Sequence, residues 1–282
     1  MGERDLDLDV AVRERALAVA VDAAHAAGAI LLEHFGKLDP AAIGTKSTPR
    51  DLVTIADVAS ERAIVARLRA AFPEHAIEAE EEVHDAREAA GERERPRWFL
   101  DPLDGTVNFV HGLPAFAVSI ALYLGREPQV AVVHVPLLGE TFGARLGGGT
   151  WLMRSGGVRV AQHVSRASEL SAAILATGFP YQRGAGLADN LDNLNRFYRD
   201  VRDLRRMGSA AVDLAYVAAG RLDGFWELSL APHDVAAGAL LVREAGGVVR
   251  DADNGENWLR GGHIVASNPA LFETIRARVT HG

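Results

Sequence analysis

The chain is organised around residues 98–106, which read Trp98-Phe99-Leu100-Asp101-Pro102-Leu103-Asp104-Gly105-Thr106. The bulky apolar start predicts a buried strand. Pro102 fixes its own φ and has no N–H, so we expect the strand to stop there. Gly105 lets the backbone approach a ligand, and the N–H groups after it can bind phosphate as at a helix N-terminus. Because acidic side chains beside an anion require cations between them, the stretch predicts a metal-dependent phosphate site.

The composition is that of an ordinary globular enzyme. The 282 residues are 48% hydrophobic and 24% charged, which suits one large domain or two intimate ones. We expect a single unit over residues 1–282, with an α+β half at about 1–164 and an α/β half at about 165–282. The net charge of −8 argues against a nucleic-acid binder that relies on a general basic surface, although Arg202, Arg205 and Arg206 form a local basic patch.

The cysteine content and the N-terminal sequence indicate the cellular compartment. The chain has no cysteine, which excludes disulfides and thiolate catalysis and fits a reducing compartment. Its start, MGERDLDLDV, is acidic and lacks an apolar signal core. We see no apolar run near the ~20 residues that span a bilayer. The expectation is a cytoplasmic protein without membrane contact.

The first half predicts helices that precede a β-rich region. A helix is expected over residues 10–35, then a loop from residue 44, then a second helix opened by a capping box of Thr54 and Asp57. A strand from Ala76 runs into an acidic edge, and residues 84–95 are expected to be an exposed excursion. Alternating apolar residues over 116–123 predict a strand, and further strands over 130–135 and 141–146 complete an antiparallel meander.

The second half alternates between strand and helix. Four strands are expected, over residues 172–176, 222–228, 248–250 and 264–266. Helices are expected over residues 187–199, 208–220 and 234–245, and a last one is expected to start at Pro269, because proline favours the first helical position. This alternation is typical of an α/β arrangement.

Four carboxylates lie at the ends of predicted elements, where α/β sites are assembled: Glu80, Asp101, Asp104 and Asp234. Packed together, they would raise one another's pKa unless cations compensated. Oxygen ligands without a Cys or His cluster favour Mg²⁺, and two ions about 3.5–4 Å apart would bridge a phosphate and lower the pKa of an attacking water. Taken singly, Asp57 and Asp234 also suit plain helix caps, Lys46 a solvated loop, and the glutamate run a solvated edge.

Three segments together resemble a known family. The segment WFLDPLDGT at 98–106, with TKSTPRDLVTIAD at 45–57 and WELSLAPHDVAAG at 226–238, closely resembles the inositol monophosphatase family of Mg²⁺-dependent, lithium-sensitive phosphatases. The likeness covers about residues 15–280. Bacterial inositol-1-monophosphatases are most similar, through MGSAAVDLAYVAAGRLDGFWE at 207–227. The resemblance implies an α+β fold layered as an α/β/α/β/α sandwich, and a homodimer.

The resemblance also implies roles for single residues. The implied metal ligands are Glu80, Asp101, the Leu103 carbonyl, Asp104 and Asp234. Thr106 with Glu80 would orient the water on a first metal, and a second metal on the three aspartates would stabilise the leaving alkoxide. Lys46 and Asp57 line an outer site for a third, loosely held Mg²⁺. The implied substrate contacts are Leu103, Asp104, Gly105, Thr106, Arg205, Gly208, Ser209, Ala210, Glu227 and Asp234, with Gly105 and Thr106 on the phosphate and Glu227, Arg205 and the 208–210 turn on the polyol.

Two departures from the family pattern leave alternatives open. Glu82 stands where a serine is usual, and the run of three glutamates leaves the ligand at Glu80 or Glu81. His233 replaces a tryptophan before the last aspartate, and it either fills the same space or titrates near neutrality.

The implied reaction is hydrolysis of inositol monophosphate to inositol and phosphate by metal-activated water. Relatives acting on fructose 1,6-bisphosphate, histidinol phosphate or 3′-phosphoadenosine nucleotides share the same ligands. A regulatory or binding protein of this fold would be expected to have lost at least one metal carboxylate, and none is lost here.

Overall fold

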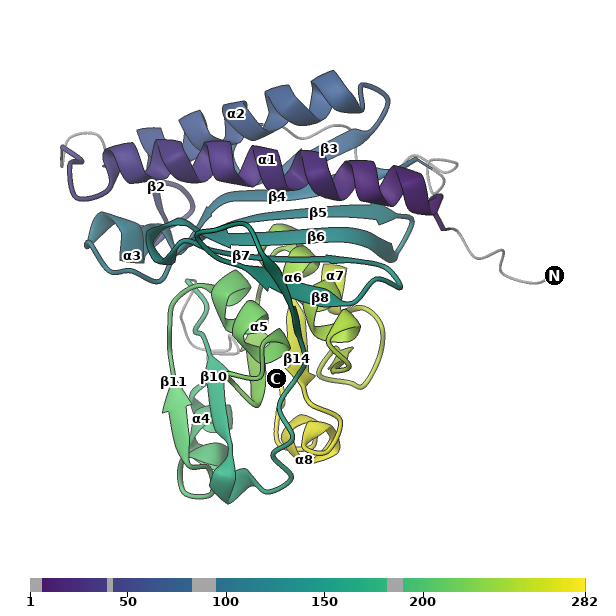
Figure 1. Cartoon of the computed structure of the whole chain (residues 1–282). Coiled ribbons are helices and arrows are strands. Elements are labelled where there is room, and N and C mark those ends of the chain that lie inside the picture. Colours follow the sequence, from purple (N-terminus) through teal and green to yellow (C-terminus); the bar gives the residue numbers. More distant parts are fainter. Residues whose placement is uncertain (1–6, 40–42, 83–94, 182–189, 282) are drawn as a thin grey trace.

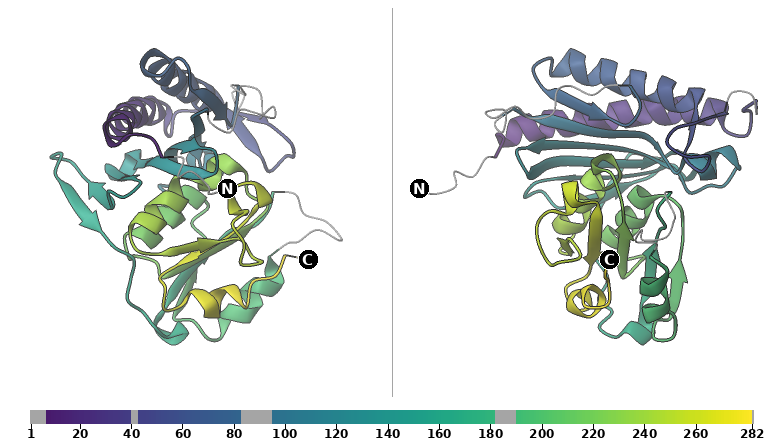
Figure 2. Two further views of the ribbon diagram at one scale, coloured as in Figure 1. Left: turned by 90° about the vertical axis from the view of Figure 1, so that its right-hand side faces the viewer. Right: turned by 180° about the vertical axis from the view of Figure 1, so that it is seen from behind.

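The chain folds into five layers in the computed structural model, which describes residues 7–39, 43–82, 95–181 and 190–281 (Figure 1). Two long helices, α1 (Val10–His34) and α2 (Ile55–Ala71), form the outermost layer above a seven-stranded sheet. Helices α5 (Ala210–Ala218) and α6 (Pro232–Glu244) lie between that sheet and a five-stranded sheet, whose far side is covered by short helices (Figure 2). The predicted α/β/α/β/α sandwich is therefore confirmed.

The seven-stranded sheet has the order β3-β4-β5-β6-β7-β8-β9. It is antiparallel throughout except for β3 and β4, which run parallel. The predicted meander is its larger part. The strand bounds are β3 Ala76–Ala79, β4 Arg97–Asp104, β5 Ala117–Leu124, β6 Glu127–Val135, β7 Glu140–Arg145, β8 Thr150–Met153 and β9 Arg159–Gln162.

The five-stranded sheet has the order β11-β10-β12-β14-β13. Its central strands β10 and β12 are parallel, while β14 runs antiparallel to both of its neighbours. The strand bounds are β10 Ile174–Thr177, β11 Asp203–Arg205, β12 Gly224–Leu228, β13 Val248–Arg250 and β14 His263–Ser267. The remaining elements are β1 Ile43–Thr45, β2 Leu52–Thr54, α3 Thr106–Val110, η3 Pro136–Leu138, η4 Leu170–Ala172, α4 Leu191–Tyr198, α7 Trp258–Gly261 and α8 Phe272–Arg276.

Apolar side chains between the layers form three core clusters among the described residues. On β5, Val118, Ile120 and Leu122 belong to the core beneath α1 and α2, while Ala117, Ala121 and Tyr123 belong to the core that also contains α5 and α6. The strand predicted from the two-residue period is confirmed, and both of its faces are buried. This second core includes residues from both sheets, although the division of the chain into units stays a prediction.

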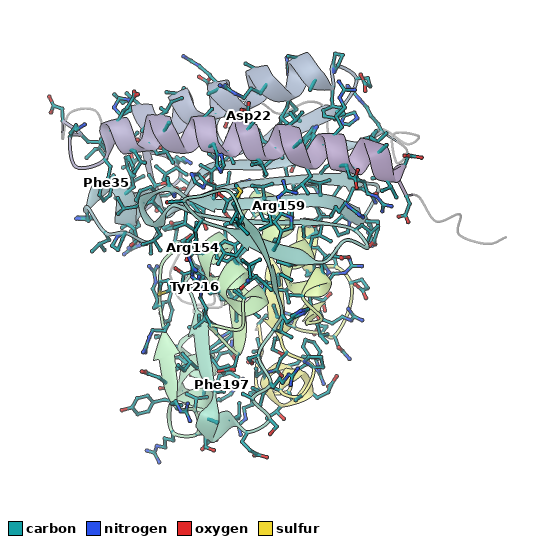
Figure 3. All side chains as sticks on the ribbon, in the orientation of Figure 1. Asp22, Phe35, Arg154, Arg159, Phe197 and Tyr216 are labelled. Atoms are coloured by element: carbon teal, nitrogen blue, oxygen red, sulfur yellow. The ribbon has the colours of Figure 1, made fainter. Side chains whose placement is uncertain are left out.

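Aromatic packing fixes the end of α1 beside the short helix α3. Phe35 follows α1 (Figure 3). The centroid of its ring lies 5.6 Å from that of the Phe109 ring and 5.2 Å from that of the Phe116 ring. Such tilted pairs stabilise a core beyond the area that they bury. They anchor the segment that follows Asp104, and so support the site from behind.

The expectation that Pro102 ends its strand is wrong. Strand β4 continues to Asp104, and its register with β5 shifts between Asp101, opposite Ser119, and Asp104, opposite Ala117. The shift is a bulge of one extra residue on β4. A bulge tolerates a proline because its residues leave the ladder, and it brings both aspartates to the same end of the sheet.

Several other boundaries differ from the predictions. Helix α6 begins at Pro232, so Asp234 is its third residue and not its N-cap; proline takes the first position because its missing N–H costs nothing there. Helix α8 begins at Phe272 rather than at Pro269, because the Asn268 side chain accepts a hydrogen bond from Leu271 N and forms a turn first. The hairpin β1–β2 and the edge strands β9 and β11 were not predicted.

Part of two predicted segments lies outside the described residues. These are most of the 84–95 excursion and the start of the 187–199 helix, whose described part begins at Leu191. The predicted capping box is confirmed: Thr54 N donates to Asp57 Oδ2 over 2.9 Å, and Ala56 N donates to Thr54 Oγ1.

Helix α1 corrects the expectation of no membrane-length apolar run. By length and composition it could cross a membrane, and 44% of its most apolar window is buried. Its buried face packs on the sheet as part of the core beneath α1 and α2. The helix therefore has the packing of a core helix.

Candidate active site

The four predicted carboxylates come together at one end of the seven-stranded sheet. Glu80 follows β3, Asp101 and Asp104 lie on β4, and Asp234 lies in the first turn of α6. Ligand atoms of Asp101, Asp104 and Asp234 lie within 4.8 Å of one another, and so do those of Glu80, Asp101 and His233. The two groups share Asp101, so the site is two adjacent clusters rather than one.

Burial and mutual repulsion make this site unfavourable for uncompensated charge. Burial, followed by the charges of Glu80, Asp104 and Asp234, raises the pKa of Asp101 well above its ordinary value. Burial and Asp234 raise the pKa of Asp104 to about 7, and burial raises that of Asp234. The carboxylates can all be ionised at neutral pH only if positive charge is added.

Lys46 supplies part of that positive charge. Its Nζ lies 2.6 Å from Glu80 Oε1 and 2.5 Å from Glu81 Oε1. Burial would raise the pKa of Glu80, but the charges of His233 and Lys46 outweigh it and hold the pKa below its ordinary value. Lys46 therefore binds at the edge of the carboxylate cluster, close to the outer position that was predicted for it.

The glutamate run separates into three different environments. Glu80 joins the cluster with Asp101, and its Oε2 is buried without a hydrogen-bond partner among the described residues. The Glu81 carboxylate faces Lys46, and burial raises its pKa to about 7. Glu82 pairs with Arg62 at the surface. The structure thus brings Glu80, and not Glu81, to the aspartates.

The Asp57 carboxylate caps the start of α2 and also contacts Thr106. Its Oδ2 accepts hydrogen bonds from the Thr54 N–H and hydroxyl, and its Oδ1 lies 3.2 Å from Thr106 Oγ1. The same Thr106 hydroxyl lies 3.1 Å from the Leu103 carbonyl oxygen. Both oxygens of Asp57 therefore accept hydrogen bonds within the protein, and its role at an outer metal site stays a prediction.

The turn before α5 holds Asp104 in place. Ser209 Oγ donates to Asp104 Oδ2 over 2.6 Å, and Ala211 N donates to the same oxygen over 2.7 Å. Gly105 has φ +94, and a Cβ there would lie 2.8 Å from the Ala115 carbonyl oxygen. Glycine is required at this position because both the conformation and the space exclude a side chain.

A cavity of about 80 Å³ opens beside Asp104 and Asp234. Its lining includes the predicted substrate contacts Gly208, Ser209, Ala210 and Glu227. Arg205 is not among its lining residues; it pairs with Asp203 over 2.6 Å on β11, and the neighbouring Arg206 lines the cavity instead. The lining residues that were not predicted are Gly178, Phe179, Pro180, Tyr181, Arg206, Ser229 and Leu230.

Two titratable side chains near the site, Tyr181 and Asp213, were missed by the sequence reasoning, and both have raised pKa values. Burial, followed by the charges of Asp104 and Asp234, raises the pKa of Tyr181. Asp213 on α5 is buried, its Oδ1 has no partner among the described residues, and burial followed by Glu227 raises its pKa well above the ordinary value. Tyr181 follows the end of strand β10, where the strand-end rule that found Asp101 also applies. No sequence signal marked Asp213.

His233 lies against the cluster. Its Nε2 is 3.6 Å from Asp234 Oδ1, and its ring belongs to the group with Glu80 and Asp101. The imidazole therefore places a nitrogen atom beside three carboxylates.

The donor set fits divalent metal ions. A bound cation would lower the repulsion among the four carboxylates, which raises the pKa values of Asp101 and Asp104. It would also give a partner to the buried Glu80 Oε2, which has none among the described residues. Oxygen donors suit Mg²⁺, and the two clusters that share Asp101 suit two ions.

Comparison with known proteins places the chain in a family. The model of the inositol monophosphatase family matches residues 12–281. The Nus factor SuhB of Escherichia coli (strain K12) is 41% identical over 263 residues, which cover 93% of this chain and 95% of that protein. The protein of the same name from Pseudomonas aeruginosa is 44% identical over 263 residues, covering 92% of this chain and 93% of that protein.

Solved structures share the fold. The inositol monophosphatase of Anabaena (Nostoc) sp. PCC 7120 superposes with a TM-score of 0.80 at 36% identity, covering 94% of this chain and 95% of that one. The extragenic suppressor protein suhB of Bartonella henselae gives a TM-score of 0.83 at 37% identity, covering 94% and 98%.

Proposed function

This chain belongs to the inositol monophosphatase family, and from that premise we propose that it is a Mg²⁺-dependent phosphomonoesterase. The proposed reaction hydrolyses inositol monophosphate to inositol and phosphate by direct attack of water. The observation that carries the proposal is the pair of ligand clusters that share Asp101. Every carboxylate that the family resemblance requires is present and buried or half-buried at this point.

The proposed metal ligands are Glu80, Asp101, Asp104 and Asp234, with the Leu103 carbonyl beside them. Bound Mg²⁺ would lower the pKa of a water and neutralise charge on the phosphate. Glu80 and the hydroxyl of Thr106, which Asp57 orients, would orient the attacking water. The N–H groups of Gly105 and Thr106 donate to the phosphate oxygens.

The cavity next to the aspartates is the proposed polyol site. Glu227 can accept hydrogen bonds from hydroxyl groups there, and Arg206 lies in the same wall. A hydroxyl-rich leaving group matches these polar groups better than an apolar one does. Phosphatases of fructose 1,6-bisphosphate, histidinol phosphate and 3′-phosphoadenosine nucleotides would share the metal ligands, so this wall is what separates the substrates.

The relatives named Nus factor raise a second class of role, because that name concerns transcription rather than hydrolysis. A protein kept only for binding has no need of every ligand carboxylate, and all of them are retained here. We therefore propose catalysis as a role of this chain. We also propose a homodimer in the cytoplasm, on the family resemblance and the absence of cysteine.

A panel of phosphate esters tests the substrate. We expect the highest kcat/KM for an inositol monophosphate, with lower values for fructose 1,6-bisphosphate, histidinol phosphate and a 3′-phosphoadenosine nucleotide. A higher kcat/KM for any of the other three would replace inositol phosphate as the substrate while leaving the reaction type in place.

A further inference from the structure

Gly178 and Glu227 lie side by side where two paired strands end. Strands β10 and β12 run parallel, with Thr177 opposite Trp226 as the last pair. Gly178 directly follows β10 and Glu227 is the next residue of β12, and both line the cavity with Asp104 and Asp234. The geometry of these two residues therefore shapes the wall that faces the leaving group.

The Glu227 carboxylate occupies the space that a side chain at residue 178 would need. A Cβ on Gly178 would lie 2.1 Å from Glu227 Oε1 and 2.2 Å from both Cδ and Oε2. The backbone of Gly178 does not itself require glycine, because its φ is outside the left-handed region. The three atoms nearest to that Cβ all belong to the Glu227 carboxylate, so the carboxylate takes the space that a side chain at residue 178 would need first.

Side-chain hydrogen bonds hold the backbone around Gly178 in place. The buried Asn190 donates from Nδ2 to the Gly178 carbonyl and to Thr177 Oγ1, both over 2.7 Å. Its Oδ1 accepts from Trp226 Nε1 over 2.8 Å, and Thr177 Oγ1 donates to the Trp226 carbonyl. One asparagine thus joins the ends of both strands. A methyl group at residue 178 would move the end of the flexible Glu227 side chain rather than either strand.

We propose that Gly178 is a positioning residue, which seats the Glu227 carboxylate against the strand end and so sets the preference of the cavity for polyol phosphates. The inference rests on the proposed function, in which Glu227 receives the hydroxyls of the leaving group. With the carboxylate seated over Gly178, the remaining cavity of about 80 Å³ stays open. With it displaced, the carboxylate enters that space and its oxygens no longer meet the same hydroxyls.

Gly178→Ala tests this through specificity. Loss of a charged hydrogen bond corresponds to roughly 10- to 100-fold in binding. We expect KM for inositol monophosphate to rise about tenfold or more, with a smaller change in kcat. The ratio of kcat/KM between inositol monophosphate and an aryl phosphate without hydroxyls should fall by a similar factor. Gly148→Ala is the matched control: its Cβ would also crowd only a flexible side chain, Arg145, at 2.5 Å, and the ratio should not change.

A double-mutant cycle separates positioning from general damage. In the Glu227→Ala background there is no carboxylate to displace, so adding Gly178→Ala should change KM by less than about twofold. Additive losses would overturn the inference. If Gly178→Ala alone fails to fold, the double variant should fold with the thermal stability of Glu227→Ala, and failure of both would also overturn it.

A crystal structure of Gly178→Ala decides the inference independently of activity. We expect the Glu227 carboxylate to be displaced while residues 177, 178 and 226 keep their places. A retained carboxylate with shifted strands would contradict the inference. If the wild-type protein hydrolysed neither ester with Mg²⁺, the proposed function would fail, and this structure would still decide the positioning claim.

Discussion

Replacing Glu80 and Glu81 separately by glutamine distinguishes the ligand from its neighbour. Each change removes one negative charge at constant volume. Glu80 shares a group of ligand atoms within 4.8 Å with Asp101. A bound cation would attract the Glu80 carboxylate: at an effective dielectric constant of about 20, opposite unit charges about 4.8 Å apart attract by roughly 3.5 kcal/mol, which is a factor of ~10²–10³. We therefore expect Glu80→Gln to lower kcat/KM at fixed Mg²⁺ by at least ~10²-fold.

Glu81→Gln is the matched control because Glu81 lies on the other side of Lys46. Its carboxylate contacts Lys46 and not the aspartates. We expect it to change kcat/KM by less than about fivefold, which corresponds to about 1 kcal/mol, since the Glu81 carboxylate pairs with Lys46 and belongs to neither group of candidate metal ligands. The assay is phosphate release over a Mg²⁺ titration, with thermal unfolding to verify the fold. Equal losses in the two variants, or a larger loss in Glu81→Gln, would refute the assignment of Glu80.

Three further predictions address other residues. Glu227→Ala should raise KM for inositol monophosphate by about tenfold and affect an aryl phosphate much less; steady-state kinetics on both esters measures this, and equal damage would place Glu227 in the metal site. His233→Trp should lower the affinity for Mn²⁺ relative to Mg²⁺, since an imidazole nitrogen suits the softer ion better. Calorimetric titration with each metal measures the two affinities. If their ratio and the pH dependence of Mg²⁺ binding between about pH 6 and 8 are both unchanged, His233 only fills the space of the usual tryptophan. Burial and the charge of His25 lower the pKa of His134 to about 4. Between about pH 6.5 and 4, the unfolded state therefore binds a proton that the folded state does not. The free energy of unfolding should fall by up to about 2 kcal/mol from pH 7 to pH 5 as a result. Urea unfolding should show a smaller fall in His134→Gln, and identical slopes in the two proteins would disprove this account.

The sequence predicted the elements whose signal is local. The alternation along residues 116–123 placed β5 because successive side chains of a strand point to opposite faces, and here they enter different cores. The pair Thr54 and Asp57 placed the start of α2 because a capping box is complete within four residues. The four carboxylates were found because each lies near the end of a strand or in the first turn of a helix.

What the sequence missed depends on contacts between distant segments. Ser209 reaches Asp104 across 105 residues, and Lys46 reaches Glu80 across 34; no spacing rule reveals such pairs. The strand through Pro102 was missed because its ladder is interrupted by a bulge that only the pairing with β5 defines. Gly178 was passed over because its need for glycine comes from the side chain of Glu227 and not from its own backbone.

Metal-dependent turnover by the wild-type protein and by Asp104→Asn is the most direct test of the central claim. Asparagine keeps the volume of Asp104 but removes the charge on the carboxylate that Ser209 and Ala211 hold. We predict that the wild type releases phosphate from inositol monophosphate with Mg²⁺, is silent in a chelator and is inhibited by millimolar Li⁺. Asp104→Asn should keep its fold and lose at least ~10²-fold in kcat. Turnover that persists in the chelator, or in Asp104→Asn at the wild-type rate, would contradict the metal-dependent mechanism.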